Sequence, residues 1–571
     1  MAKIKQLIEC VPNFSEGRDM NVINQITDEI RNSAGVRLLD VDPGEATNRT
    51  VVTFVGEPEA VMEAAFRAVR KASQLIDMRQ HHGAHPRSGA TDVLPFVPVA
   101  GITLEECAEL ARKLAKRLAD ELEIPCYCYE AAALKPERKN LAVVRRGEYE
   151  AIPERINDPA EAPDFGARPF DEGVARTGCT NVGARDFLIA VNYNLNTTST
   201  RRANAIAFDV REKGRPAREG NPITGKVKLD ENGKKIMIPG TLKGTKGIGW
   251  YIEEYGIAQV SMNITNINVT PLHVAFDEVC RCAQNRGVRV TGTEIVGLVP
   301  ERTLLEAGRY FLEKQQRSTG IPKEDIINIA IKSLGLSDLK PFNPREKVIE
   351  YLLEDENGDD KALVKMTVKG FAEETSRESP APGGGSVAAY MGALGAALGT
   401  MVPNLSSHKP GWDDRWEEFS RWADKGQALS EELLVLVDED TRAFNKIMEA
   451  FGLPKKTDED KRLRSEAIQA ATLFATQVPL QTMQAAFGAF ELCQAMAEFG
   501  NPNSVSDAGV GALAARAAVL GAGLNVKINA ASLKDRETAD KMIAEAEQLI
   551  AEAQKKEAEI IGIVERKINE A

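Results

Sequence analysis

The sequence predicts a multidomain chain in which two ferredoxin-like α/β subdomains are followed by an all-α helical bundle. Strand and helix signals alternate in the order β-α-β-β-α-β over the first third of the chain, which is the ferredoxin-like split pattern. The same order recurs in the next third. Beyond residue 366 the strand signals disappear, and Ala, Leu, Glu, Gly and Lys dominate. A length of 571 residues agrees with about three to four compact units.

Apolar and β-branched runs define the strands of the first subdomain, and helical spacing of apolar residues defines its helices. Pro58 suits the first turn of a helix, and Val61, Phe66 and Val69 share one face of that helix. We expect strands at 7–11, 36–41, 50–55, 93–97 and 124–129, and helices at 21–31, from 58 onward and at 104–122.

The second subdomain repeats this order. We expect strands at 187–192, 249–253, 258–263 and from 288, and helices at 201–211 and 272–282. Two turn signals within 221–240 predict an inserted hairpin. The predicted domains are therefore residues 1–187, 188–353 and 366–571, with an acidic, glycine-containing linker at 354–365. A cleft between two α/β halves is a natural ligand site.

Composition argues against several classes of protein. The net charge of −12 argues against a nucleic-acid partner, although a local cationic pocket can still bind an anionic substrate. Eight cysteines without a CxxC pair are too few for a disulfide scaffold, so we expect reduced thiols in a cytoplasmic protein. The longest apolar run, 387–401, is short and rich in Gly and Ala, which predicts a buried helix and no membrane partner.

Three of the five histidines cluster in HHGAHPRSGATD, a loop that precedes the strand at 93–97. Histidine titrates near neutrality, so His81, His82 and His85 are candidates for general acid/base catalysis. Two alternatives stay open. The histidines can be surface residues without a catalytic role, or they can bind a metal, although no carboxylate ligand of known spacing accompanies them.

A second polar group lies in LLDVDPGEATNRT. Asp40 and Asp42 share one face at the end of a strand, close in sequence to Asn48 and Arg49. The arginine can pair with a carboxylate or stabilise a neighbouring acid. A polar hairpin turn with a surface ion pair would explain the same residues.

In the predicted bundle, the motif PAPGGGSVAA places Gly383, Gly384, Gly385 and Ser386 at the start of a helix. Free backbone N–H groups there can bind an anion or a polar heterocycle, with Ser386 as a candidate N-cap. The alternative is a tight approach of two helices, since glycines continue at small-residue spacing at positions 392, 395 and 399.

Two acidic segments follow. In LVDEDTRAF, consecutive residues point in different directions on a helix, so only one of the three acids can face a given pocket. Asp440 is nearest the apolar side of that helix, where burial would raise its pKa. A solvated helix face is the alternative. In NPNSVSDAGVG, Asp507 is expected either to cap the next helix or to contact a ligand.

Several long motifs, in one order along nearly the whole chain, resemble the formiminotransferase-cyclodeaminase family, two-domain folate enzymes of histidine breakdown. ECVPNFSEG, LLDVDPG with TNRTVVTFVG, GAHPRSGATDVLPFVPV, GARDFLIAVN, GIGWYIEE and GLVP resemble the transferase half, and APGGGSVAA and LVDEDTRAF resemble the cyclodeaminase half. The resemblance implies a homo-oligomer whose first half moves the formimino group of N-formimino-L-glutamate to N5 of tetrahydrofolate and releases glutamate. It implies that the second half cyclises the product to 5,10-methenyltetrahydrofolate and releases ammonia.

The resemblance also implies site residues. His85 matches the catalytic histidine of the transferase half, with Asp42 and Arg49 as its acid and arginine, and Asp440 matches the cyclodeaminase acid. Folate contacts are expected at Gly166 and Gly178, at the turn that contains Gly383, Gly384, Gly385 and Ser386, and at Asp507. The expected co-substrate is polyglutamylated tetrahydrofolate, with its tail held by cations such as Arg201 and Arg202, and no metal is expected.

The chain departs from the vertebrate motif GEHPRMG at Ala84 and Ser88, its 166–178 loop is longer than the family's, and the segment 221–240 is extra. Two other functional classes are kept as alternatives. One is a folate-binding or scaffold protein that retains a single activity, and the other is a metal-dependent hydrolase that uses the three clustered histidines. The presence of both His85 and Asp440 argues against the loss of one activity.

Overall fold

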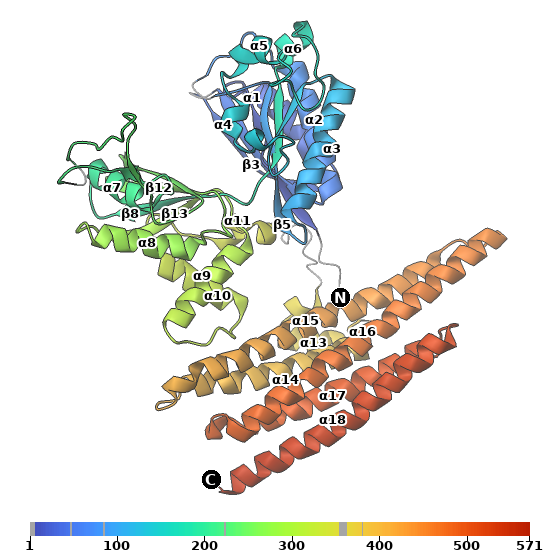
Figure 1. Cartoon of the computed structure of the whole chain (residues 1–571). Coiled ribbons are helices and arrows are strands. Elements are labelled where there is room, and N and C mark those ends of the chain that lie inside the picture. The colour runs from blue at the N-terminus through green and yellow to red at the C-terminus, as the bar shows by residue number, and fades with distance from the viewer. Residues whose placement is uncertain are drawn as a thin grey trace. The chain divides into compact units, whose positions relative to one another are not determined.

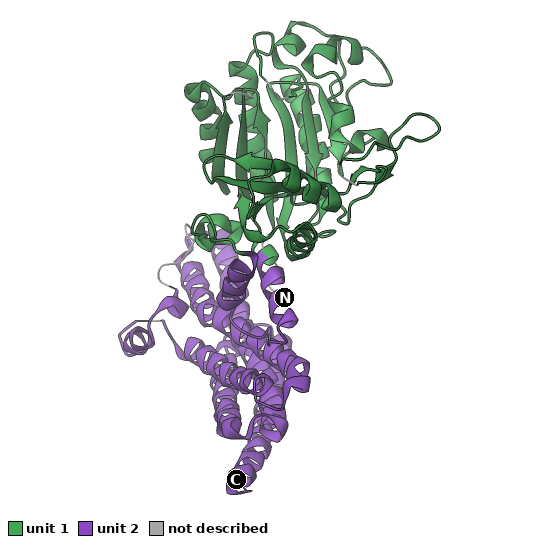
Figure 2. Ribbon diagram, turned by 90° about the vertical axis from the view of Figure 1, so that its left-hand side faces the viewer, with its two compact units in different colours: residues 1–303, 335–354 green, residues 304–334, 355–571 purple. Residues whose placement is uncertain are grey.

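The computed structural model describes residues 6–45, 48–83, 86–221, 224–352, 362–379 and 381–570. It divides into two compact units (Figure 2), one formed by residues 1–303 with 335–354 and the other by residues 304–334 with 355–571. The first unit contains the sheets and the second is helix-rich, in agreement with the predicted change of fold class along the chain.

The first sheet begins the chain and has the strand order β3–β4–β1–β5–β7–β6, with the short β2 continuing the path of β1 between β4 and β5. Strands β1 to β5 pair in antiparallel fashion, whereas β7 runs parallel to β5 and β6. The strands are β1 (Leu7–Cys10), β2 (Asn13–Phe14), β3 (Val36–Gly44), β4 (Arg49–Gly56), β5 (Thr91–Ala100), β6 (Cys126–Glu130) and β7 (Thr180–Ala184).

Three helices pack with this sheet around a shared hydrophobic core (Figure 1): α1 (Met20–Arg31), α2 (Pro58–Leu75) and α3 (Leu104–Leu122). Pro58 is the first residue of α2, and the predicted face of that helix is buried. Helix α3 starts at a capping box formed by Thr103 and Glu106, which satisfies two backbone N–H groups at its N-terminus. These three predicted helices are confirmed, with ends that differ by at most one residue where both were predicted.

Strands β3 and β4 form a hairpin whose register decides where the polar residues lie. Asp42 is opposite Val51, and Gly44 is opposite Arg49. The hairpin therefore brings Asp42 and Arg49 to the same end of the sheet. The chain between β6 and β7, for which no elements were predicted, carries the short helices η1 (Pro136–Lys139), α4 (Leu141–Val144), η2 (Tyr149–Ala151), α5 (Ile152–Arg155) and α6 (Glu172–Thr177).

The second sheet is antiparallel throughout and has the order β11–β12–β8–β13. Its elements are β8 (Ile189–Leu195), α7 (Thr200–Val210), β11 (Thr245–Ile252), β12 (Ile257–Ile264), α8 (Leu272–Gln284) and β13 (Val290–Val296). The predicted inserted hairpin is confirmed, but it starts before residue 221. Strand β9 (Arg215–Pro216) pairs with β10 (Met237–Ile238), and two further bridges join Arg218 to Val227 and Leu229 to Lys235. Residues 222–223 of that segment lie outside the described residues.

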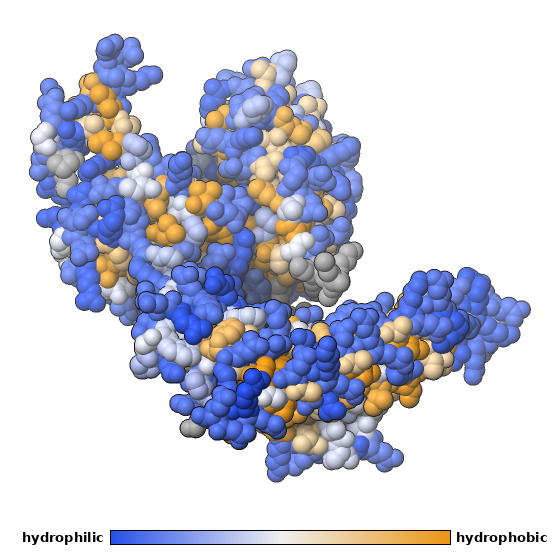
Figure 3. All heavy atoms as spheres, turned by 60° about the horizontal axis from the view of Figure 1, so that its bottom comes forward, coloured by the Kyte–Doolittle hydropathy of each residue, from blue (hydrophilic) through white to orange (hydrophobic). Residues whose placement is uncertain are grey.

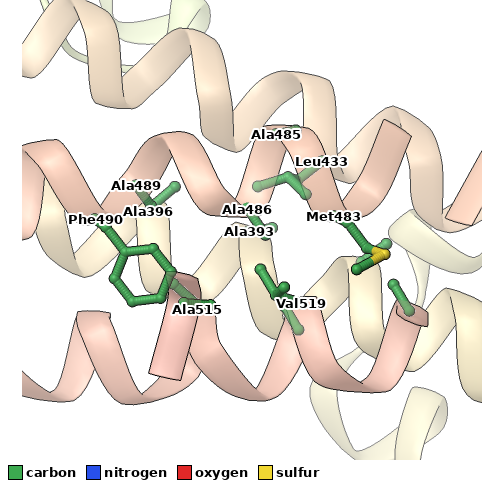
Figure 4. Packing of buried hydrophobic residues seen from close by; sticks show 14 of the residues in the cluster. Ala393, Ala396, Leu433, Met483, Ala485, Ala486, Ala489, Phe490, Ala515 and Val519 are labelled. Carbon is green, nitrogen blue, oxygen red and sulfur yellow. The ribbon is translucent and has the colours of Figure 1, made fainter. Parts of the chain in front are cut away.

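The helix-rich unit has a core made largely of small side chains. Ala393, Ala486 and Ala515 contribute to it from three helices, together with Leu433 and Phe490 (Figure 4). Its long helices are α9 (Glu301–Lys314, whose first turn belongs to the other unit), α10 (Lys323–Leu334), α14 (Gly384–Ser407), α15 (Trp416–Gly452), α16 (Asp458–Phe499), α17 (Val505–Ala530) and α18 (Arg536–Glu570). Its short helices are η3 (Leu363–Lys365), α13 (Val368–Thr375), η4 (Asp413–Arg415) and η5 (Pro502–Ser504).

The expected close approach of helices at the glycine stripe is confirmed. A Cβ atom added to Gly395 of α14 would lie 2.8 Å from the carbonyl oxygen of Gly511 in α17. A Cβ atom on Gly399 would lie 2.8 Å from the side chain of Leu492 in α16. These positions need glycine because a side chain would push the helices apart.

The predicted linker is only partly described, because residues 353–361 lie outside the described residues. The last residues of the predicted linker pack against the helical core. Leu363–Lys365 forms η3, Leu363 is buried in the helical core, and its backbone N–H donates to Asp438 Oδ1 at 2.7 Å. The predicted domain boundaries remain predictions.

A segment before the predicted linker also groups with the helices. Residues 304–334, which include most of α9 and all of α10, belong to the helix-rich unit. Thr319, between these two helices, donates a hydrogen bond to Asp424 of α15 at 2.9 Å, and its backbone N–H donates to Ser420 at 3.0 Å. Asn404 of α14 donates to the carbonyl oxygen of Gly320 at 2.8 Å.

Two helical segments among the described residues, α14 and 502–530, are long and apolar enough to cross a membrane by length and composition. Half or more of each apolar window is buried inside the helical core, as expected for a core helix. The predicted buried helix at 387–401 is confirmed, but it is longer than expected because it extends from Gly384 to Ser407.

Candidate functional sites

The first candidate site surrounds Arg49, at the start of β4. Burial is the main cause that lowers the pKa of the Arg49 guanidinium, and the second cation Arg145 lowers it further. The two acids Asp92 and Asp42 raise it. Arg49 thus lies within the electrostatic range of both acids and of a second cation. Asp42 is exposed, as is Asp40 two residues earlier on the same strand. The two predicted residues Asp42 and Arg49 are brought together.

His81 is held inside the protein. Its Nε2 atom lies 2.8 Å from the carbonyl oxygen of Asn48, and Arg87 Nε donates to its Nδ1 atom over 3.4 Å. A carbonyl oxygen can only accept, so Nε2 carries the proton and the ring is neutral. Burial lowers the pKa of His81, which agrees with that state. Both ring nitrogens are therefore occupied, which argues against His81 as a metal ligand.

Asn48 and Arg145 fix the histidine loop on both sides of its centre. Asn48 accepts a hydrogen bond from the Gly17 backbone N–H at 3.0 Å and donates to the carbonyl oxygen of His82 at 3.1 Å. Arg145 donates to the carbonyl oxygen of Pro86 at 3.3 Å. His85, between these anchors, lies outside the described residues, as does Ala84. Its acid/base role remains a prediction.

Buried charges support the same loop. Asp92 is fully buried and accepts from Arg145 at 2.6 Å and from the Ser88 backbone N–H at 2.9 Å. Burial raises the pKa of Asp92 despite these partners. Arg87 pairs with Glu150 at 2.7 Å and with Glu148 at 3.1 Å.

Sequence reasoning missed the roles of Arg87, Asp92 and Arg145. The first two lie inside the quoted histidine motif, which was a signal that could have found them. Arg145 gave no signal, because it is 53 residues from its partner Asp92.

The two glycines predicted to contact folate lie in different places. Gly178 pairs with Gly89, and a Cβ atom added to it would lie 2.3 Å from the carbonyl oxygen of Ser88, so it adjoins the end of the histidine loop. Gly166 instead packs against Ala119 of α3. Both have positive φ angles, +66° and +68°, which favour glycine for reasons of backbone conformation. The structure thus explains Gly166 by packing and brings only Gly178 to the loop.

The second candidate site lies where α15 meets the N-terminus of α14. Asp440 Oδ2 accepts hydrogen bonds from the Ser386 backbone N–H at 2.9 Å and from the Ser386 hydroxyl at 3.1 Å. Burial raises the pKa of Asp440, while these two hydrogen bonds lower it by a smaller amount. The expected direction of the pKa shift is confirmed.

Ser386 is not the N-cap of α14, contrary to expectation. The N-cap is Gly383, and Ser386 is the third residue of the helix, so Asp440 of the neighbouring helix supplies the oxygen that accepts its N–H. The glycines before it leave room for this contact. A Cβ atom on Gly385 would lie 2.1 Å from Asp440 Oδ1, closer than any real contact.

A cavity of about 140 Å³ opens at this carboxylate. Gly383, Gly384 and Gly385 line it, with Phe444 and Ile447 as apolar walls and Asn525 and Asn529 as amides from α17. Sequence reasoning missed these two asparagines, because their four-residue spacing is also typical of ordinary helix surfaces. A half-buried acid, backbone N–H groups and side-chain amides around an apolar wall suit a polar heterocycle that exchanges protons.

The three consecutive acids of α15 point to three different partners, as expected. Asp438 accepts from Leu363, Glu439 pairs with Arg442, and only Asp440 lines the cavity. Asp507 does not line this cavity, so its expected folate contact remains a prediction. Asp507 is in the first turn of α17, 18 residues before Asn525 and therefore about 27 Å away along the helix.

The part of the chain that the structure describes contains no group of three His, Cys, Asp or Glu side chains arranged for a metal ion. None of the eight cysteines, all of which lie in the described ranges, forms a disulfide, and seven of them are buried.

Comparison with known proteins identifies both halves. Family models match residues 7–185 (Formiminotransferase domain, N-terminal subdomain), residues 190–354 (Formiminotransferase domain) and residues 367–548 (Formiminotransferase-cyclodeaminase). The formimidoyltransferase-cyclodeaminase of Mus musculus is 42% identical over 562 residues, which cover 98% of this chain and 99% of the mouse protein. The chain belongs to the formiminotransferase-cyclodeaminase family.

Each half also matches a shorter protein. The glutamate formimidoyltransferase of Streptococcus pyogenes is 40% identical over 55% of this chain and 94% of its own length. The methenyltetrahydrofolate cyclohydrolase of Methylorubrum extorquens is 39% identical over 36% of this chain and 98% of its own length. Both domains of the family are therefore present in one chain.

Proposed function

We propose that this chain catalyses two consecutive reactions of one-carbon metabolism in histidine degradation. The first unit transfers the formimino group of N-formimino-L-glutamate to N5 of tetrahydrofolate and releases glutamate. The helix-rich unit cyclises 5-formimino-tetrahydrofolate to 5,10-methenyltetrahydrofolate and releases ammonia. The observation that carries the proposal is the match of both halves, in order and almost end to end, to a bifunctional relative.

Formimino transfer passes through a tetrahedral carbon, so it needs a base for the attacking amine and an acid for the leaving amine. We assign this proton transfer to His85. Asp42 and Arg49 orient the histidine or bind the substrate carboxylates. The assignment is supported by the hydrogen bonds that anchor the chain at His82 and at Pro86, and by the electrostatic interaction of Arg49 with Asp92 and Asp42.

Cyclisation joins N10 to the formimino carbon and breaks the bond from that carbon to the leaving nitrogen. Ammonia leaves more readily when that nitrogen is protonated, so we assign Asp440 as the acid. The raised pKa of Asp440 supports this role, because a carboxyl that keeps its proton nearer to neutral pH is a better donor. We assign the carboxamides of Asn525 and Asn529 to binding of the polar ring of the folate, which their position in the cavity lining supports.

The remaining features of the proposal concern the whole chain. Tetrahydrofolate is the co-substrate, in polyglutamylated form, and no metal takes part. Both sheets are ferredoxin-like, which the β-α-β-β-α-β order of their elements supports. A cytoplasmic location is supported by the cysteines, which form no disulfide in the described part of the chain.

We also propose a homo-oligomer. It is supported by apolar side chains that reach the surface of the helix-rich unit (Figure 3), among them Leu524 and Ile528, each 70% exposed.

A paired assay tests the two reactions. Purified protein is mixed with tetrahydrofolate and N-formimino-L-glutamate, and glutamate, ammonia and methenyltetrahydrofolate absorbance are followed together. His85→Ala should abolish glutamate release but leave cyclisation of supplied 5-formimino-tetrahydrofolate intact, and Asp440→Asn should do the opposite. Loss of both activities in both folded variants would contradict the assigned partition of sites. Glutamate release without ammonia would favour a protein with one activity, and stoichiometric metal would favour the hydrolase alternative.

The match to a cyclohydrolase supports a second candidate for the helix-rich unit, namely hydrolysis of methenyltetrahydrofolate. Hydrolysis and cyclodeamination both act on a folate, but they break different bonds. Supplying methenyltetrahydrofolate alone separates them. Decay of its absorbance faster in the parent than in Asp440→Asn indicates hydrolysis, whereas equal decay together with ammonia release from 5-formimino-tetrahydrofolate indicates cyclodeamination.

A further inference from the structure

A cavity of about 570 Å³ lies between α7 and the inserted hairpin of the second sheet. Its lining is strongly cationic and contains the side chains of Arg201, Arg211, Lys213, Arg215, Arg218 and Lys235. Phe208 and Met237 add apolar wall. The residues that line it include no carboxylate. It shares no lining residue with either candidate reaction site.

The positive charge of this cavity is largely uncompensated. Among the described residues, an ion pair is recorded for only one of the six cations, Arg215 with Asp209 at 3.2 Å, and Asp209 also pairs with Arg286. Arg211 donates to the carbonyl oxygens of Gly214 and Gly247, both at 3.1 Å, and burial lowers its pKa.

Within the described part of the chain, the remaining cations of the cavity also form no ion pair with an acid. Arg218 donates to the carbonyl oxygen of Gly225 at 2.7 Å. Arg201, Lys213 and Lys235 are exposed at its rim. Carbonyl oxygens orient these guanidinium groups but do not neutralise them.

Such an arrangement is costly without a ligand, because like charges in one cavity repel each other and are less screened than charges on open surface. This cluster of positive charge lies in a chain whose net charge is −12, so it is not a consequence of a generally basic composition. Guanidinium groups bind phosphate and carboxylate oxygens through paired hydrogen bonds, and a cationic cavity raises the local concentration of anions. The apolar wall indicates that the ligand is not a bare inorganic ion.

We propose that this cavity binds a small molecule in which a ring is joined to a chain of at least three negative charges. Two sources have this chemistry. One is a nucleoside triphosphate, and the other is the p-aminobenzoyl-γ-glutamate portion of a polyglutamylated folate. The segment between β9 and β10 supplies Arg218 and Lys235 to the cavity, and β10 supplies Met237, so the site depends on the inserted hairpin.

Calorimetric titration of the full chain tests the proposal directly, without reference to either reaction. The probes are ATP and p-aminobenzoyl-tri-γ-glutamate, each at low and at high salt. At least one probe should bind with one site per chain, and the binding should weaken as salt rises. Tighter binding of ATP identifies the nucleotide source, and tighter binding of the glutamate probe identifies the folate tail. Failure of both probes to bind would overturn the proposal.

Matched variants separate a built site from general charge. The triple variant Arg201→Gln, Lys213→Gln, Lys235→Gln removes three rim cations and should weaken binding at least tenfold. The control Lys226→Gln, Lys228→Gln, Lys234→Gln makes the same change of charge on exposed residues of the same hairpin that do not line the cavity, and should change binding less than twofold. Lys213→Arg with Lys235→Arg keeps the charge and should bind like the parent. Equal weakening in the two triple variants would overturn the proposal.

Discussion

Asp440 combines two roles in one side chain. It accepts the N–H of Ser386, which would otherwise lack a partner within the first turn of α14, and it lines the cavity of the second candidate site. The contact is possible because Gly385 has no Cβ. The position of the acid therefore depends on a glycine on another helix.

Gly385→Ala tests this dependence. The added Cβ would lie 2.1 Å from Asp440 Oδ1, so the carboxylate must move, and misplacement by about 1 Å lowers a rate on the order of 100-fold. We expect cyclodeaminase activity to fall by that factor while transferase activity stays within twofold. Gly562→Ala is the matched control, because a Cβ there meets no atom within 4 Å. Full activity of Gly385→Ala would contradict the role given to this contact.

Glu9 is a buried carboxyl on β1, only 5% exposed. Burial raises the pKa of Glu9 to about 7, although Arg185 lowers it. The folded state therefore holds this proton up to about pH 7, whereas the unfolded chain releases it near 4.5. The stability linked to this proton is fully present below pH 4.5 and is lost as pH rises through 7.

Glu9→Gln should remove this loss. Between pH 4.5 and 8, the free energy of unfolding of the parent should fall by about 3 kcal/mol relative to that of the variant, and most of this fall should occur below pH 7. Urea unfolding followed by circular dichroism at several pH values measures the difference. Glu59→Gln, at an exposed position of α2, is the control and should leave the pH dependence unchanged. Parallel pH profiles for parent and Glu9→Gln would contradict the argument.

Sequence reasoning identified single residues better than it identified their partners. Asp440 was singled out because its helical position placed it near apolar neighbours, which is a local property. The bonds of His81 to Asn48 and Arg87 were not foreseen, because one partner is a backbone carbonyl 33 residues away and the other is an arginine in the same loop. Spacing in the sequence carries no information about such contacts.

At the scale of elements, segments with a clear periodicity or an apolar run were predicted well, and segments with neither were missed. Helix α3 has the expected ends, 104 and 122. Strand β2 was missed because two residues are too few to show a periodicity. Strand β7 was missed because its sequence, TNVGA, contains Asn, Gly and Ala, which are uncommon in strands, and because all five residues are buried and show no alternation. The missed β7 matters for the site, because it follows Gly178 and pairs in parallel with β5 beside the histidine loop.

The histidine loop is an element without regular structure, so side chains must hold it. Asn48 has φ +47° and anchors the loop through His82. Asn48→Gly tolerates the backbone angle but loses both side-chain hydrogen bonds, and Asn48→Asp keeps the acceptor for Gly17 but loses the donor to His82.

We expect transferase kcat/KM to fall about 100-fold in Asn48→Gly and less in Asn48→Asp, with cyclodeaminase activity unchanged. Steady-state rates of the two reactions in one preparation measure both effects. Unchanged transferase kcat/KM in Asn48→Gly would show that the loop is not held by these bonds.

At the scale of the whole molecule, the two compact units do not follow the order of the chain. Residues 304–334 lie within the stretch matched by the formiminotransferase domain model, but they belong to the helix-rich unit. Sequence patterns placed the boundary near residue 354 because composition changes there. Composition does not report which helices share a core.

Thr319 tests the attachment of this segment. Its hydroxyl bonds to Asp424, whose pKa is raised by burial and lowered by this hydrogen bond. Thr319→Val should lower the free energy of unfolding of the helix-rich unit by about 1–3 kcal/mol, whereas Thr319→Ser should have little effect. The fluorescence of Trp412, Trp416 and Trp422 reports this unit, since the fourth tryptophan lies in β11. Equal stability of the two variants would contradict the attachment.

The position of residues 304–334 limits how the halves of such proteins can be recombined. Stand-alone relatives show that each half exists as a separate protein. In this chain, a chimera joined near residue 354 would pair a foreign 304–334 segment with the native surface at Asn404, Ser420 and Asp424. Exchange of halves between lineages therefore requires the 304–334 segment to be inherited together with the helical surface that it contacts. Among related proteins, the residues of the segment and of that surface should change together.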